Sequence, residues 1–201
     1  MTPGQCIKEK QREAEEKQKL AEEWHIPLLC KKQWTLKAAL VSMDTFKLDP
    51  SDVPLIIRLV ENPKYDIGLF AGSTNLGTHD CAHLLLGRGV QIKDEAFVIG
   101  FTMGSTRKMK RWRRNLYMFC AKYLFPEGYK FKEEERFVFN MAVEVGARCK
   151  TDLSTVDFAQ YGSRTLADLR DEIGIDRVLL RNCYEVEKKC FRESPESQRL
   201  L

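Results

Sequence analysis

Four residues in one short stretch have the types and the spacing to bind a metal ion. His79 and His83 are four positions apart, so a helix places their imidazoles on one face, and Asp80 shares that face. Glu95 follows His83 by twelve positions, across the turn Gly87-Arg88-Gly89, near the start of an expected antiparallel helix. Imidazoles and carboxylates together form a ligand set that suits zinc, iron or manganese. The pattern therefore predicts a metal site made of His79, Asp80, His83 and Glu95.

Ordinary structural roles also account for the acidic residues. Asp80, Asp94 and Glu95 lie near expected helix starts, where the helix dipole favours a carboxylate whether or not it binds anything. The two histidines one turn apart are the part of the pattern that favours a metal. Spacing alone leaves both interpretations open.

Two competing motifs fail on their chemistry. The stretch from Gly72 to Gly77 has the glycine spacing of a phosphate-binding loop, but Thr78 and His79 stand where that loop needs Lys and Ser or Thr. A zincin protease needs Glu beside its first histidine, and Asp80 is one methylene too short to reach a metal-bound water well.

A metal phosphohydrolase of the HD type is an alternative that the spacing leaves open. It would need a separate upstream histidine, a His-Asp doublet and a distal aspartate. The residues available for it are His25, the doublet at 79 and 80, and Asp152 or Asp157. This scheme leaves His83 and Glu95 without a role.

Helical patterns surround these residues. Apolar periodicity and breakers predict helices over 34–46, 51–60, 92–103, 106–125, 131–147 and 165–172, and one more from a cap at Asn75 or Thr78 to Gly87. No alternating strand pattern or Asn-Gly hairpin signal is present. We expect an all-α protein of six or seven helices, with a polar arm at 1–24, a metal-binding domain at 25–185 and a polar tail at 186–201.

Composition restricts the class of protein. With 201 residues, 43% apolar and 31% charged, the chain suits one globular domain. No apolar run reaches the ~20 residues that a membrane span needs. The seven cysteines include no CxxC pair, which favours reduced thiols. The mixed-charge N-terminus resembles neither a secretory signal nor a transit peptide, so we expect a cytoplasmic location.

The net charge of +4 conceals one concentrated basic segment. Six cations occur in eight residues around Trp112, namely Arg107, Lys108, Lys110, Arg111, Arg113 and Arg114. As a basic amphipathic helix, this segment predicts contact with an anionic membrane, at about 1 kcal/mol per cation. A solvated face or a phosphate headgroup site is the alternative. No nucleic-acid reading module is present, so we expect no nucleic-acid partner.

Two glycines precede the basic segment. Gly100 and Gly104 are four positions apart on the expected helix and leave a smooth strip along it. Either a flat lipid tail or a closely packed helix could lie on this strip.

The metal-site pattern carries a resemblance to a known family. The sequence His79-Asp80-x-x-His83, eleven residues and Glu95 resembles the HDxxH-x11-E motif of the ubiquinone-biosynthesis family known as the fourth coenzyme Q biosynthesis protein. The neighbouring Thr78 to Gly89 and Glu95 to Phe97 are also similar to that family. The likeness extends over residues 33–180.

The resemblance implies an all-α protein with a divalent metal, usually zinc, beside an apolar tunnel for a polyprenyl tail. By position, the metal ligands would be His79, Asp80, His83 and Glu95. It further implies peripheral association with the inner membrane, on the matrix side in a eukaryote. The partners would be other quinone biosynthesis enzymes and a polyprenyl quinone intermediate, and the activity oxidative removal of the ring carboxyl group, a lyase reaction.

Three functions stay open at this point. The first is a metal-dependent enzyme of prenylated-quinone biosynthesis, and the second a non-catalytic scaffold that binds an isoprenoid lipid. The third is the HD-type phosphohydrolase. A second copy of the chain is also left open as a partner. Because two of the three histidines belong to the metal site, we expect any catalysis to use the metal and not a histidine base.

Overall fold

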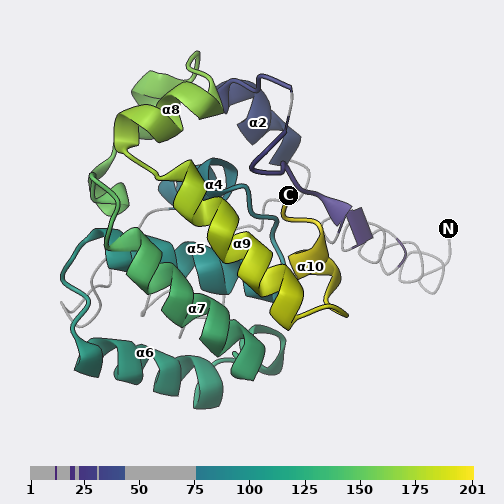
Figure 1. Cartoon of the computed structure of the whole chain (residues 1–201), viewed down its shortest axis with the longest axis vertical. Helices are drawn as coiled ribbons and strands as arrows, with labels where there is room; N and C mark the ends of the chain where they lie inside the picture. The colour runs from purple at the N-terminus through teal and green to yellow at the C-terminus, as the bar shows by residue number, and fades with distance from the viewer. Residues whose placement is uncertain (1–11, 13–18, 21–22, 31, 44–75) are drawn as a thin grey trace, which may run out of the picture.

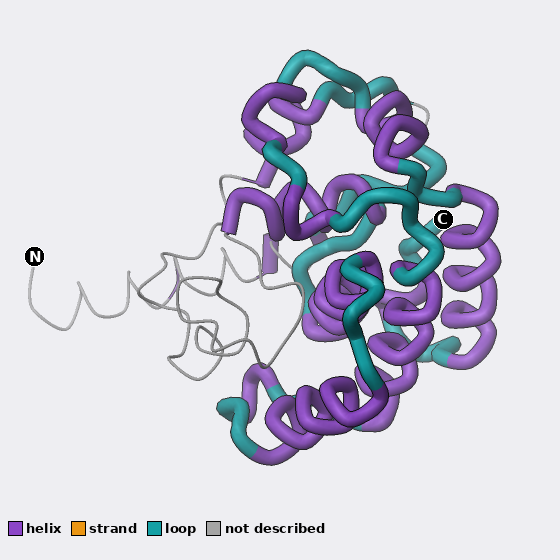
Figure 2. Tube along the Cα trace, turned by 90° about the vertical axis from the view of Figure 1, so that its left-hand side faces the viewer, coloured by secondary structure: helices purple, strands orange, loops and turns teal. Residues whose placement is uncertain are grey.

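Helices form the framework of the protein in the computed structural model (Figure 1). The structure describes residues 12, 19–20, 23–30, 32–43 and 76–201. These residues contain eight α-helices, three short 3₁₀ helices and no strand beyond an isolated bridge between Thr35 and Thr165. Figure 2 shows helices and loops throughout the described chain. The prediction of a single all-α domain is confirmed.

The centre of the fold is α5 (Ile92–Ser105), whose residues are buried from Lys93 onward except Glu95. Its main neighbour is α7 (Glu133–Gly146). Glycines allow this close crossing, because a Cβ at Gly100 or Gly104 would collide with carbonyl oxygens of α7. Helix α7 therefore packs on the strip formed by Gly100 and Gly104, which was one of the two expectations. Our assignment of Gly100 and Gly104 to lipid contact is corrected.

Below these two helices in Figure 1 lies α6 (Arg111–Tyr123), which packs Tyr117 against Phe139 of α7 with ring centroids 5.0 Å apart. The helix begins five residues later than the pattern predicted. Arg107, with a φ of 55°, and the residues up to Lys110 form the connection that precedes it. Part of the expected basic helix is thus a loop.

Helix α4 (Leu76–Leu86), which carries His79 and His83, lies between the central and the upper parts of the molecule (Figure 1). It contacts α2 (Leu36–Met43), α5 and α8 (Leu166–Ile173). Three 3₁₀ helices complete the connections: η3 (Glu127–Tyr129), η4 (Leu153–Thr155) and η5 (Phe158–Tyr161). The helix expected over 51–60 and most of the N-terminal arm lie outside the described residues.

Two helices near the C-terminus were not predicted: α9 (Arg177–Cys190) and α10 (Pro195–Gln198). The inner face of α9 carries Leu180, Cys183, Tyr184 and Glu187. A charged residue occupies the last position of this face, so its apolar pattern is short. Glu187, Ser197 and Leu200 are fully buried, and the segment 186–201, which we expected to be a polar tail, packs onto the domain.

No helix in the described part of the chain is both long and apolar enough to span a bilayer.

Candidate metal centre

The two histidines owe their position to the way α4 ends. Gly87, with a φ of 65°, terminates the helix in a Schellman motif, in which the Arg88 N–H bonds the His83 carbonyl at 2.9 Å. A Cβ at Gly87 would lie 2.7 Å from the backbone nitrogen of Leu28, so only glycine fits there. The chain then turns within five residues and starts α5, which brings Glu95 back to the histidine face of α4.

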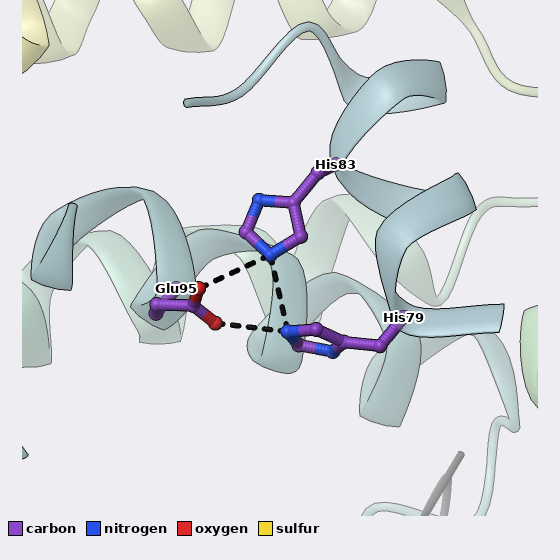
Figure 3. A group of neighbouring side chains, drawn as sticks. All are labelled: His79, His83 and Glu95. Carbon is purple, nitrogen blue, oxygen red and sulfur yellow. Dashed lines mark hydrogen bonds and ion pairs between the residues drawn. The ribbon is translucent and has the colours of Figure 1, made fainter. Parts of the chain in front are cut away.

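The side chains of His79, His83 and Glu95 converge on one point (Figure 3). Nε2 of His79 lies 2.9 Å from one carboxylate oxygen of Glu95, and Nε2 of His83 lies 3.3 Å from the other. The two Nε2 atoms are 3.1 Å apart. Ligand atoms around a tetrahedral zinc are about 3.3 Å from one another. The three side chains are therefore spaced as ligands of a single divalent ion would be.

A backbone contact orients the inner histidine. Nδ1 of His83 donates a hydrogen bond to the carbonyl oxygen of Gly89 at 2.6 Å. A carbonyl can only accept, so Nδ1 carries a proton, and in the neutral ring, the form that binds a metal, the lone pair is on Nε2, which faces His79 and Glu95. Histidine ligands of metals generally have such an outer partner. The arrangement of the residues present thus fits a metal.

Burial differs across the site. The His83 side chain is 1% exposed, whereas His79 and Glu95 are 21% and 32% exposed. The site therefore has a closed inner wall and an outer side that solvent, and a ligand, can reach.

The charge state of Glu95 follows from its neighbours. Burial by itself raises the pKa of this carboxyl group, but His83 and His79 more than offset that effect and hold it well below its usual range. Glu95 is thus an ionised carboxylate, the form that binds a metal.

Asp80 is the predicted ligand that the structure does not bring to this point. The group of converging ligand atoms in the described residues consists of His79, His83 and Glu95. Asp80 is half-buried on α4 beside them and is not a member of that group.

The residues of the phosphohydrolase alternative are engaged elsewhere. His25 donates a hydrogen bond to the Gly87 carbonyl at 2.8 Å. Asp152 and Asp157 cap η4 and η5 by accepting hydrogen bonds from Ser154 and Ala159, respectively. None of the three joins the metal-ligand group formed by the described residues.

The basic segment forms part of a wider surface. Trp112 is 51% exposed, and Lys108, Lys110 and Arg111 are exposed. Two of the predicted contact residues have protein partners: Arg107 donates to the carbonyl of Cys149, and Arg114 pairs with Glu144 at 2.7 Å.

A groove of about 540 Å³ lies between α6 and α7. Exposed Phe119 and Tyr123 line it on the α6 side. Five cations on the two helices or at the N-cap of α7 line it together with one acid, Glu133; the cations are Arg111, Arg114, Lys122, Lys132 and Arg136. The sequence pattern did not indicate that residues of α7 contribute cations to this surface, because segments far apart in the chain share a surface only through packing.

Comparisons with protein-family models, with curated proteins and with solved structures found no match to this chain.

Proposed function

We propose that this protein binds one divalent metal ion through His79, His83 and Glu95 and functions in the biosynthesis of ubiquinone or a related prenylated quinone. Zinc is the first candidate for the ion. The observation that supports the metal site is the convergence of three potential ligand atoms within 4.8 Å of one another. They come from two helices that a short turn joins. The quinone assignment is supported by the HDxxH-x11-E spacing of the same residues.

The exposed side of the site is where a substrate ring would bind. A bound divalent ion supplies a Lewis acid that polarises a ring carboxylate or phenol oxygen. His83 forms the buried wall, and Glu95 brings a fixed negative charge that favours retention of the ion. The activity proposed is removal of the ring carboxyl group of a polyprenyl hydroxybenzoate as carbon dioxide, with the bonding electron pair staying on the ring carbon and a proton from solvent taking the place of the carboxyl group.

Elemental analysis of the purified protein, combined with mass spectrometry of an organic-solvent extract, tests this function. We expect one equivalent of zinc and a prenylated ring compound. The His79→Ala variant should lose both the metal and the turnover of a polyprenyl hydroxybenzoate. Absence of metal from the wild-type protein after zinc addition would overturn the proposal.

Two outcomes of the same experiment identify the alternatives. Zinc and bound prenyl lipid without any turnover would favour the non-catalytic scaffold. The Asp157→Asn variant tests the phosphohydrolase alternative. If our proposal holds, this variant should keep the metal content of the wild-type protein. Loss of metal and of phosphatase activity in Asp157→Asn or His25→Ala would favour the HD-type enzyme instead.

We further propose that the surface around α6 docks peripherally on an anionic membrane. Exposed Trp112, Phe119 and Tyr123 offer aromatic rings of the kind that enter a membrane interface. The groove beside them has five cations and one acid along its walls, so its charge is complementary to acidic headgroups. Docking there would bring the protein to the bilayer in which a polyprenyl substrate is dissolved.

A further inference from the structure

The end of α4 is held by side chains from distant parts of the chain. Four consecutive carbonyls, from residue 84 to residue 87, accept hydrogen bonds from residues between 62 and 98 positions away. Arg170 of α8 donates to Leu84 and Leu85, while Tyr184 of α9 donates to Leu86 at 2.5 Å. His25 donates to Gly87. The turn that follows the metal-site helix is therefore fixed by tertiary contacts.

Arg88, in the middle of that turn, is the largest fully buried side chain among the described residues. Its guanidinium group donates two hydrogen bonds to Glu187 of α9, at 3.0 and 2.6 Å. It also lies against the rings of Phe97 and Tyr184, with its central carbon 3.9 and 4.4 Å from their centroids. Burial opposes its charge, but Glu187 more than offsets this and raises the pKa of Arg88. Arg88 is thus a fixed cation.

A second arginine holds the other side of the turn. Arg199 donates to Asp94 at 2.7 Å, and the same carboxylate oxygen accepts a hydrogen bond from the Gln91 N–H. The guanidinium group of Arg199 packs directly on Gly89, where an added Cβ would collide with it. Asp94 precedes Glu95, so this contact also anchors the first turn of α5.

Gly89 therefore packs against the pair of Arg199 with Asp94, and it directly follows Arg88, which is fixed by Glu187. Its carbonyl oxygen is the partner of His83 Nδ1. We propose that Arg199 and Arg88 are positioning residues for the metal: they hold the Gly89 carbonyl where it orients the His83 imidazole. This inference rests on the metal site proposed above.

Stability alone is a weak reason for the Arg88–Glu187 pair. Both side chains are 0% exposed, and taking two charges out of water carries a large desolvation penalty. Apolar residues of similar volume often stabilise a core equally well. What the pairs add is a fixed direction: Arg88 is held within the turn and Arg199 is held against Gly89, whose carbonyl oxygen bonds a ligand histidine.

Metal affinity of the Arg199→Met variant tests the proposal, with Arg192→Met, an exposed position nearby, as the matched control. Methionine keeps the apolar stem of Arg199 and removes its hold on Asp94 and Gly89. Competition with a chromophoric chelator for Zn²⁺ should show binding weakened about 10- to 100-fold in Arg199→Met, as for other outer partners of metal ligands. Arg192→Met should bind zinc as the wild-type protein does.

The Arg199→Lys variant keeps the test decisive if Arg199→Met does not fold. Lysine preserves the charge but lacks the planar guanidinium group. We expect Arg199→Lys to unfold near the wild-type temperature without metal, to bind Zn²⁺ more weakly, and to change the visible absorption of Co²⁺ bound at saturation. A purely structural role would leave that absorption unchanged.

The outcomes separate this inference from the proposed function. Failure of the wild-type protein to bind zinc would overturn the metal site itself. Zinc binding by the wild-type protein with equal affinity in a folded Arg199 variant would overturn only the positioning role.

Discussion

Nδ1 of His83 and the carbonyl oxygen of Gly89 lie 2.6 Å apart, on the two sides of a helix end. One belongs to α4 and the other to the turn after it. The contact joins His83, the only fully buried histidine of the described residues, to a carbonyl in that turn. The turn is held by Glu187 of α9, through Arg88, and by Arg199 near the C-terminus. The geometry of the candidate metal centre therefore depends on segments about one hundred residues away in sequence.

The first prediction concerns which residues bind the metal. We expect His83→Ala and Glu95→Gln to weaken zinc binding more than about 100-fold, beyond the effect of losing an outer hydrogen-bond partner. Asp80→Asn should weaken it less than about tenfold, because Asp80 is not in the converging group. Chelator competition measures all three. If Asp80→Asn lost as much zinc affinity as Glu95→Gln, Asp80 would be a metal ligand after all.

The second prediction tests the close crossing of α5 and α7. Gly104→Ala should lower the free energy of unfolding by about 1–3 kcal/mol, because the new methyl group meets the Val143 carbonyl. Gly128→Ala is the control, since a Cβ there has no atom within 4 Å. Urea unfolding measures the free energy of unfolding of both variants, provided that its dependence on urea concentration is the same as in the wild-type protein. A Gly104→Ala variant as stable as the wild-type protein would show that the helices separate easily.

The third prediction addresses membrane docking. The protein should cosediment with vesicles that contain phosphatidylserine, and this binding should weaken as salt rises. The variant Lys132→Glu/Arg136→Glu should bind more than about tenfold more weakly, since each cation near such a surface contributes about 1 kcal/mol.

Two further variants complete the docking experiment. Trp112→Ser should also reduce binding, whereas Arg181→Glu, a charge reversal on the exposed side of α9, should have little effect. Equal binding to vesicles of phosphatidylcholine alone, or an equal effect of Arg181→Glu, would contradict docking through the α6–α7 surface.

The fourth prediction concerns the pH dependence of stability. Burial is the main cause that lowers the pKa of His25; the Gly87 carbonyl and Asp94 oppose this, while Arg199 and Arg88 add to it. The unfolded chain, with a histidine pKa near 6.5, then binds the proton more readily than the folded chain. Stability is therefore complete above about pH 6.5 and falls as the pH drops through the lower, folded value.

His25→Gln isolates this effect, because the glutamine amide can still donate to Gly87 but does not titrate. Unfolding temperatures between pH 7.5 and 5, measured with a chelator present, should fall less steeply for His25→Gln than for the wild-type protein. Parallel curves would show that His25 does not contribute to the acid sensitivity.

Local patterns in the sequence were enough to predict most of the helices and to bring together the three converging residues of the candidate metal centre. The pair His79 and His83 shares a face because helical geometry alone places positions i and i+4 together. Glu95 could be added because Gly87 and Gly89 require a short turn. These are patterns over a few residues, so the sequence indicates them even though distant segments hold the turn in place.

Long-range packing determined the rest. Helix α9 was not predicted because its apolar face is short and ends at the buried Glu187. The burial of that charge is explained only by Arg88, ninety-nine positions earlier. From the sequence, Gly104 could contact either a lipid tail or another helix, and only the structure shows that α7 packs on it. In both cases the partner comes from a distant segment, and only the packed core, which excludes water and aligns opposite charges, selects it.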